Sequence, residues 1–154
     1  MPLNDLVDAN AILPALRVST KKQALQELSE KAAEITGMQA REIFDALLQR
    51  ERLGSTGVGG GIAIPHGKMP RAERIFSVFA RLERPIDFDA LDGEPVDLIF
   101  LLIAPEGAGA DHLKALSRIA RALRDPGLTA RLRATRDASG LHLLLTQTPA
   151  SYAA

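Results

Sequence analysis

The chain has 154 residues, of which 46% are hydrophobic and 25% are charged, a composition that suits one globular domain with its own core. Nineteen Lys and Arg balance nineteen Asp and Glu, so no net charge draws the protein to nucleic acid, and we expect no nucleic-acid partner. The absence of cysteine excludes disulfides, thiol catalysis and cysteine-ligated metals. The N-terminus does not resemble a signal peptide, and no apolar run approaches the roughly 20 residues that span a bilayer. We expect a cytoplasmic protein without membrane insertion.

Two amphipathic helices are predicted in the first third of the chain. Thr20 and Gln23 have the spacing of a capping box, apolar residues then recur at helical spacing, and Gly37 is a good stop. A second apolar stripe begins at Ile43 and predicts a helix that ends near Glu51. A glycine-rich stretch, LGSTGVGGG, follows.

The middle of the chain reads as strands. A short strand is predicted at 62–65 and a longer one at 75–82, with turns marked by Pro85 and by Asp92-Gly93. Residues 96–104 are almost continuously apolar, which predicts a central strand covered on both faces.

Helices return after this strand. Asp111 is a candidate cap for a helix that Pro126-Gly127 ends, and two short helices are predicted at 128–134 and 137–146. The order of helices, strands and helices without a linker predicts a single α/β layered domain over residues 1–147, followed by a flexible C-terminal tail at 148–154.

The glycine-rich stretch leads into GGGIAIPHGK and does not fit a nucleotide-binding loop. A Walker A pattern that starts at Gly54 would need lysine where Gly60 stands. A dinucleotide pattern that starts at Gly57 would need glycine where Ile62 stands. Its backbone N–H groups can still face an anion, but we expect neither ATP nor NAD, and no cofactor.

Two of the three histidines are candidates for phosphoryl chemistry. His66 lies between a proline and a glycine, and a neutral imidazole can attack phosphorus with one nitrogen while a hydrogen bond holds the other. His112 follows the candidate helix cap, where the helix dipole favours an anion such as phosphate. The alternatives are a turn histidine without a task and a solvated helix-end histidine. His142 stands among leucines, and a structural role is predicted for it.

Other functional groups give weaker signals. Arg50 and Arg52 could bind phosphate bidentately or could be solvated residues at a helix end. Asp111 is the one further ligand in sight for a metal held by both histidines, and the spacing is unsuitable, so no metal is predicted. A serine hydrolase lacks its Gly-x-Ser-x-Gly elbow.

Three segments resemble a known family, in the same order. RERLGSTGVGGGIAIPHGK (50–68), ERPIDFDALDGEPVDLIFLLIAP (83–105) and DHLKALSRIARAL (111–123) resemble the mannitol/fructose-type enzyme IIA proteins of the phosphoenolpyruvate-dependent phosphotransferase system, and most closely its nitrogen-regulatory branch. The resemblance covers residues 3–146. It implies a mixed β-sheet flanked by helices, with the strand at 62–65 beside the central strand.

The resemblance also implies roles for individual residues. His66 would be the phosphoryl acceptor, and His112 would stabilise charge at the start of the late helix. Arg50, rather than Arg52, would contact the phosphoryl group or support the site. Gly60 stands where relatives often have Asn or Glu, so a side-chain contact at that position is absent.

The function expected on this basis is that of a phosphohistidine phosphocarrier. It would be a phosphotransferase only in the limited sense of a phosphohistidine intermediate, without independent turnover of a small molecule. An HPr-like carrier protein would donate the phosphoryl group, and the phosphorylation state would regulate proteins such as a sensor kinase or a potassium transporter. Alternatives are a sugar-specific enzyme IIA that passes phosphate to a membrane permease, and an interaction module that is not phosphorylated.

A group of late arginines has two interpretations. It could form a solvated helix face or a docking patch for an acidic partner, and its members are Arg118, Arg121, Arg124, Arg131, Arg133 and Arg136.

Overall fold

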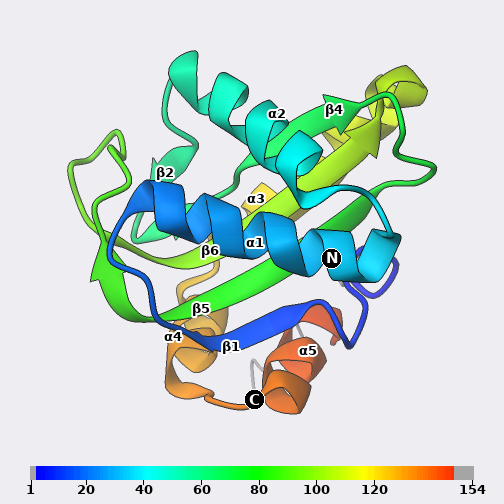
Figure 1. The fold of residues 1–154 in the computed structure, drawn as a ribbon. Helices are drawn as coiled ribbons and strands as arrows, with labels where there is room; N and C mark the ends of the chain where they lie inside the picture. Colours follow the sequence, from blue (N-terminus) through cyan, green and yellow to red (C-terminus); the bar gives the residue numbers. More distant parts are fainter. Residues whose placement is uncertain (1–2, 148–154) are drawn as a thin grey trace.

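A computed structural model describes residues 3–147, which form a mixed β-sheet between two layers of helices (Figure 1). The strands are β1 (Ile12–Leu16), β2 (Gly57–Gly59), β3 (Ile62–Ala63), β4 (His66–Met69), β5 (Phe76–Ile86) and β6 (Val96–Pro105). The helices are α1 (Lys21–Thr36), α2 (Ala40–Arg52), α3 (Ala110–Ala122), α4 (Pro126–Ala134) and α5 (Ala138–Thr146), with a 3-10 turn at Glu106–Ala108. Within residues 3–147, no helix is long and apolar enough to cross a membrane.

The sheet is built around β6. Its strands follow the order β1-β5-β6-β3-β2, and β4 also pairs with β6. β5 runs antiparallel to β6, whereas β3 and β4 both run parallel to β6 along its other edge. The expected position of the strand at 62–65 beside the central strand is therefore confirmed, although β3 itself is only two residues long.

The almost continuous apolar run of β6 has a simple cause. Alternate side chains of a strand point to opposite faces, and both faces of β6 are covered by helices. Ile99, Leu101 and Ile103 pack in the cluster that includes α1 and α2. Leu98, Phe100 and Leu102 pack in the cluster that includes α3, α4 and α5. The predicted mixed, layered α/β fold is confirmed.

The first two helices begin and end largely where the sequence predicts. The Thr20 hydroxyl accepts a hydrogen bond from the Gln23 backbone N–H at 3.1 Å, as in a capping box. The Gln23 side chain accepts from the backbone N–H of Ser19, whereas a regular capping box would use the N–H of the N-cap residue, Thr20. Gly37 ends α1 with a positive φ of 76° and bonds back to Ala33, a conformation that glycine adopts without steric cost.

Three predicted boundaries are wrong, and each error has a local cause. Gly109, not Asp111, caps α3, so Asp111 lies in the first turn and contributes only its charge. Pro126 begins α4 at a position that needs no backbone N–H, and the Asp125 side chain caps it. Pro85 lies inside β5, where the register with β6 shifts between Arg81 and Ile86; a missing donor is tolerated at such an irregularity.

Three strands are absent from the sequence-based expectation. β1 contains a proline, β2 has two glycines among three residues, and β4 reads HGKM, so none shows an apolar alternation. The predicted tail at 148–154, and with it the predicted domain boundary, lies outside the described residues.

Candidate active site

The turn residues around His66 favour a loop, but in the structure His66 is the first residue of the strand β4. β3 and β4 are two collinear segments on the same edge of β6, and Ile64 and Pro65 lie between them. Pro65 has no N–H to donate, so an interruption here loses no ladder bond on the donor side. Its carbonyl still accepts from the Leu102 N–H at 2.9 Å. The register with β6 is the same on both sides of this gap, so the His66 ring points, like Ile62 and Ile64, to the face of the sheet that α3 covers.

Two contacts fix the tautomer of His66. Its Nδ1 lies 2.9 Å from the carbonyl oxygen of Ile64, and because a carbonyl only accepts, Nδ1 carries the hydrogen. The Nε–H of Arg50 points to Nε2 of the same ring at 3.3 Å, which requires a lone pair on Nε2. The nitrogen that carries the free lone pair in this neutral imidazole is therefore Nε2.

The surroundings of His66 favour this neutral form. Burial lowers the pKa of His66 below its ordinary value of 6.5, the Ile64 carbonyl opposes this shift, the charge of Arg50 adds to it, and Glu51 opposes it. The lowered pKa leaves the ring unprotonated near neutral pH, which is the form that can act as a nucleophile.

His112 lies beside His66 although the two are far apart in the sequence. It is the third residue of α3 and is 5% exposed. The two ring centroids are 5.7 Å apart and the rings meet edge to face at 66°. Burial, and then the charges of His66 and Lys68, lower the pKa of His112. Its buried Nε2 has no hydrogen-bond partner among the described residues, and a buried polar atom in this state is costly unless a bound group satisfies it.

Arg50 joins this pair from the last turn of α2. Besides its contact with His66, its Nη1 donates to the carbonyl oxygen of Gly54 at 3.1 Å. Among the described residues it is Arg50, and not Arg52, that hydrogen-bonds to the His66 ring. The structure thus brings together the three residues singled out in the sequence: His66, His112 and Arg50.

An open, largely apolar hollow lies next to the His66 ring. It has a volume of about 260 Å³ and is lined by Arg50, Ser55, Thr56, Val58, Ile64, His66, Leu116, Ser117 and Ala120. A second hollow of about 470 Å³ shares Val58, Ile64 and Ala120 with it and extends past α4. Val58, which lines both hollows, is 55% exposed. Apolar surface of this kind around a reactive group suits contact with another protein.

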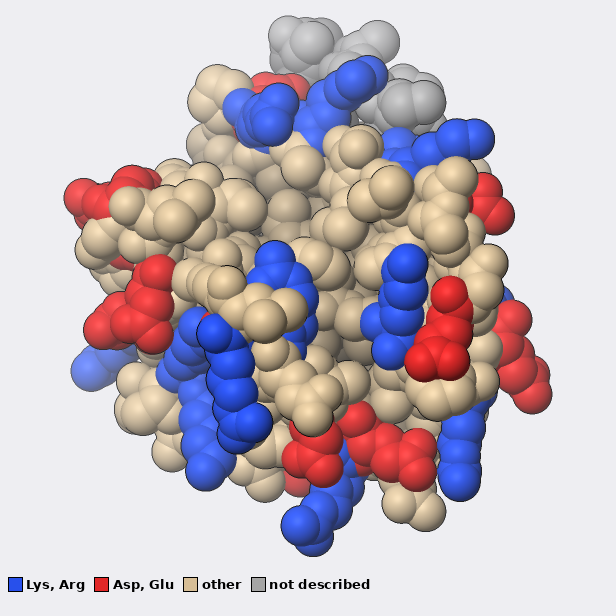
Figure 2. All heavy atoms as spheres, turned by 90° about the horizontal axis from the view of Figure 1, so that it is seen from above, with Lys and Arg blue, Asp and Glu red and all other residues tan. Residues whose placement is uncertain are grey.

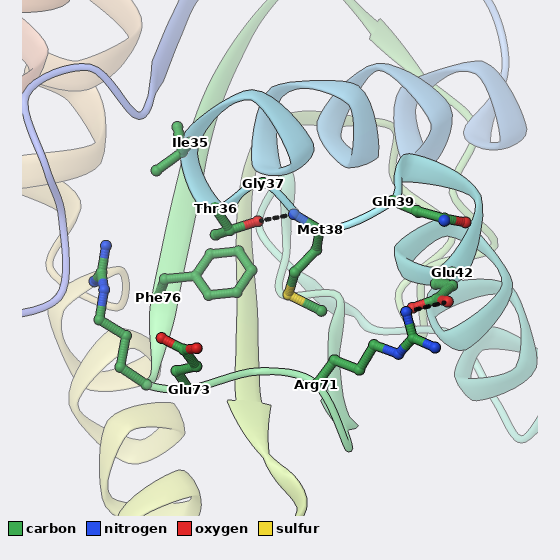
Figure 3. A pocket seen from close by; sticks show the side chains of 10 residues that line it. Ile35, Thr36, Gly37, Met38, Gln39, Glu42, Arg71, Glu73 and Phe76 are labelled. Carbon is green, nitrogen blue, oxygen red and sulfur yellow. Dashed lines mark hydrogen bonds and ion pairs between the residues drawn. The ribbon is translucent and has the colours of Figure 1, made fainter.

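A larger hollow of about 680 Å³ lies elsewhere, where α1 ends, α2 begins and the segment before β5 passes (Figure 3). Its floor includes Met38 and Phe76, and an ion pair of 3.6 Å joins Glu42 to Arg71 across one side (Figure 3). No histidine lines this hollow, so it lacks the nucleophile that phosphoryl transfer to nitrogen needs. Within residues 3–147, no group of three or more metal-ligating side chains occurs.

Two side chains from distant parts of the sequence hold the turn at Gly60. Its N–H donates to Asp92 at 3.0 Å, and its carbonyl accepts from Arg133 at 2.7 Å. Arg133 also donates to Asp97, at 2.9 Å for the shorter contact. The sequence predicted that a side-chain contact is absent at this position, but it did not identify Asp92 and Arg133, whose partners become visible only in the fold.

Two of the late arginines are held in ion pairs. Arg118 makes an ion pair of 2.6 Å with Asp5, and Arg133 is engaged with Asp97. On the face seen from above, acidic side chains lie among the basic ones around uncharged surface (Figure 2). The interpretation as a docking patch is therefore weakened for these two residues.

Glu51 is the main residue that the sequence analysis passed over. Its side chain is only 4% exposed and contacts Lys21 and Thr56. One signal was available: a carboxylate in the last turn of a helix faces the negative end of the helix dipole, which indicates a compensating contact.

Comparison with known proteins gives a consistent result. Residues 5–148 match the family described as "Phosphoenolpyruvate-dependent sugar phosphotransferase system, EIIA 2". A nitrogen regulatory protein of Bradyrhizobium diazoefficiens is 63% identical over 153 residues, covering 99% of this chain and 100% of that protein. The crystal structure of nitrogen regulatory protein IIA-Ntr from Neisseria meningitidis superposes with a TM-score of 0.88 at 33% identity, covering 94% and 99% of the two chains.

The fold extends to more distant proteins. The crystal structure of IIA mannitol from Escherichia coli superposes with a TM-score of 0.78 at 23% identity, covering 90% of this chain and 98% of that one. The family match spans nearly the whole chain, and the two nitrogen regulatory proteins are similar over almost their full lengths. The chain belongs to the EIIA type 2 family of the phosphoenolpyruvate-dependent sugar phosphotransferase system.

Proposed function

We propose that the protein is a phosphohistidine phosphocarrier in which Nε2 of His66 accepts a phosphoryl group from the phosphohistidine of an HPr-like carrier protein. The observation that carries this proposal is the state of the His66 ring: Nδ1–H is bound to the Ile64 carbonyl, Nε2 keeps the lone pair, and the residue lines an open hollow. Family membership supports phosphoryl transfer as the chemistry.

The proposed step moves one bond from nitrogen to nitrogen. The Nε2 lone pair of His66 forms a bond to phosphorus as the bond between phosphorus and the donor's histidine nitrogen breaks, and that nitrogen keeps the electron pair. Positive charge develops on the His66 ring, and the Nδ1–H···O=C contact with Ile64 stabilises it. The transfer depends on positioning and electrostatics, and a metal is not required in principle.

Arg50 and His112 have complementary roles in this proposal. When Nε2 bonds to phosphorus, the Arg50 Nε–H loses its acceptor and has phosphoryl oxygens in its place; charge-assisted bonds of this kind are among the stronger hydrogen bonds in proteins. The buried Nε2 of His112, in the tautomer that carries hydrogen there, gains the acceptor that it lacks. His112 also lies in the first turn of α3, where the helix dipole favours an anion.

The surface around the site suits regulation of other proteins. Phosphorylation adds a charge of about −1.5 to −2, taking phosphoserine as a guide, beside a hollow with apolar lining residues such as Val58 and Leu116. A partner that packs against this apolar surface would then distinguish the two states. We infer a cytoplasmic regulator of proteins such as a sensor kinase or a potassium transporter, in line with the nitrogen regulatory relatives.

The test is phosphorylation by purified components. The protein is incubated with phosphoenolpyruvate, enzyme I and the nitrogen-type carrier, and intact mass spectrometry measures the gain of one acid-labile phosphoryl group. H66A is expected to abolish the gain, whereas H142A, which alters a histidine outside the site, is expected to retain it. The proposal is wrong if the wild type stays unmodified while a known enzyme IIA is labelled in the same mixture. Onward transfer to a sugar-specific membrane component would favour the sugar-transport alternative.

A further inference from the structure

Glu51 places a buried carboxylate one residue from Arg50, and its polar contacts are with two residues, Thr56 and Lys21. Its Oε1 accepts from the Thr56 backbone N–H at 3.1 Å and lies 2.8 Å from the Lys21 ammonium. Its Oε2 accepts from the Thr56 hydroxyl at 2.5 Å. Glu51 therefore holds Thr56 by both its backbone and its side chain.

The contacts continue from Thr56 to the His66 ring. The Thr56 carbonyl accepts from the Ile64 N–H at 2.9 Å. The Ile64 carbonyl in turn accepts from His66 Nδ1 at 2.9 Å. We call these four residues (Glu51, Thr56, Ile64 and His66) the positioning chain. It links α2, the glycine-rich stretch and the break between β3 and β4.

The direction of its backbone groups explains why Ile64 needs this support. The carbonyl of its neighbour Pro65 accepts from Leu102 of β6, whereas the N–H of Ile64 turns the other way, to the Thr56 carbonyl. A residue of this kind keeps its orientation only through specific partners. Thr56 supplies the partner, and a buried, ion-paired carboxylate fixes Thr56.

We propose that Glu51, acting through Thr56 and Ile64, is a positioning residue that holds the His66 ring in its Nδ1–H tautomer with Nε2 directed toward the phosphoryl donor. The catalytic part of this inference rests on the proposed phosphocarrier function, whereas the tautomer does not. Contacts in the shell behind a reactive group fix its tautomer and orientation in many active sites.

The position of Lys21 is consistent with this role. Its ammonium pairs with Glu51 and lies 4.8 Å from the centre of the Phe88 ring. A buried charge pair of this kind contributes little net stability, but removal of one member is costly because the other charge is left unpaired. The pair therefore holds the carboxylate in one place more than it stabilises the fold.

The experiment compares substitutions at the two ends of the Glu51–Thr56 contact. T56V removes the hydroxyl at nearly constant shape, T56S retains it, and E51Q removes the carboxylate charge. E42Q makes the same chemical change as E51Q on the same helix, at a partly exposed position in the other hollow, where Glu42 pairs with Arg71. Two-bond proton–nitrogen correlation spectra of protein with nitrogen-labelled histidine report the tautomer of His66, and rapid-quench assays report phosphoryl uptake from the carrier.

We expect wild type, T56S and E42Q to show the Nδ1–H tautomer, and T56V and E51Q to show a mixture of tautomers. Phosphoryl uptake by the last two should fall by about tenfold or more, because small losses of alignment have large effects on rate. If T56V and E51Q lower only the melting temperature and keep both the tautomer and the uptake rate, Glu51 is a structural residue and the inference is wrong. If no variant, wild type included, accepts phosphate, the proposed function fails, while the spectra still test the positioning chain.

Discussion

Replacement of Arg50 by glutamine tests the proposed chemistry most directly. The substitution removes a guanidinium whose Nε donates to His66 Nε2 at 3.3 Å and whose Nη1 donates to the Gly54 carbonyl at 3.1 Å. Glutamine is shorter and uncharged, so it cannot supply both contacts or place a positive charge beside the phosphoryl group. R52Q makes the same change two residues away at an exposed position and is the matched control.

The size of the expected effect follows from the kind of contact that is lost. A hydrogen bond to a charged group is worth about 1.5–3 kcal/mol, and a contact that strengthens in the transition state converts to about 10- to 150-fold in rate. The effect on stability should be smaller, because Arg50 is partly exposed and its bond to Gly54 joins a single carbonyl. We expect a loss of about 1 kcal/mol or less in the free energy of unfolding.

Single-turnover transfer from the isotope-labelled carrier measures this rate, with urea denaturation as the stability measurement. R50Q should be slower than wild type by the factor given above, while R52Q should stay within about twofold. Equal rates for R50Q and R52Q would refute the role of Arg50, because the charge at this helix end would then act only generally.

Three further outcomes are expected. Burial lowers the pKa of both His66 and His112, so the unfolded chain binds protons that the folded chain does not. The free energy of unfolding should therefore fall as pH drops through about 6.5. H112N should reduce this dependence on pH in urea titrations at several pH values, and an unchanged dependence would contradict the pKa shift of His112. G60A and G61A carry similar strain from positive φ, but only at Gly61 would a Cβ lie 2.6 Å from Arg133. The free energy of unfolding of G61A should therefore be lower than that of G60A by about 1 kcal/mol or more. Equal stabilities of the two variants would contradict the described turn. H142A removes a hydrogen bond of 3.1 Å to the Val7 carbonyl and should cost about 1 kcal/mol without slowing phosphoryl uptake, so a slower uptake would count against a purely structural His142.

The parts of the fold that could be predicted are those in which one element carries its own pattern. Apolar periodicity and caps located α1 and α2, and the length of the apolar run located β6. β4 could not be found in this way, because its residues HGKM are held by pairing with β6 and not by their own propensity. The Asp111 cap was misplaced because a side chain that can cap a helix does so only if the backbone turns there, and here it turns at Gly109.

The candidate site likewise combines residues that local sequence features indicate with contacts that exist only in the fold. His66 could be singled out because the proline and the glycines beside it are local features of the sequence, whereas the helix end pointed equally to Arg50 and Arg52, and the family resemblance selected Arg50. The meeting of His66 with His112 could not be predicted from spacing, because it depends on α3 lying on the face of β6 that His66 borders. Glu51 was missed because its importance depends on Lys21, which belongs to another helix.

The order of residues in IAIPHGK follows from the geometry of one sheet edge. Successive residues of a strand turn their backbone groups to opposite sides, and here Pro65 turns its carbonyl to Leu102 of β6 while Ile64 turns its N–H to Thr56. The Ile64 carbonyl therefore also faces away from β6, and it is the group that binds His66 Nδ1. The same strand edge thus holds the hydrogen on Nδ1 and leaves the lone pair on Nε2, the nitrogen that we propose as the phosphoryl acceptor.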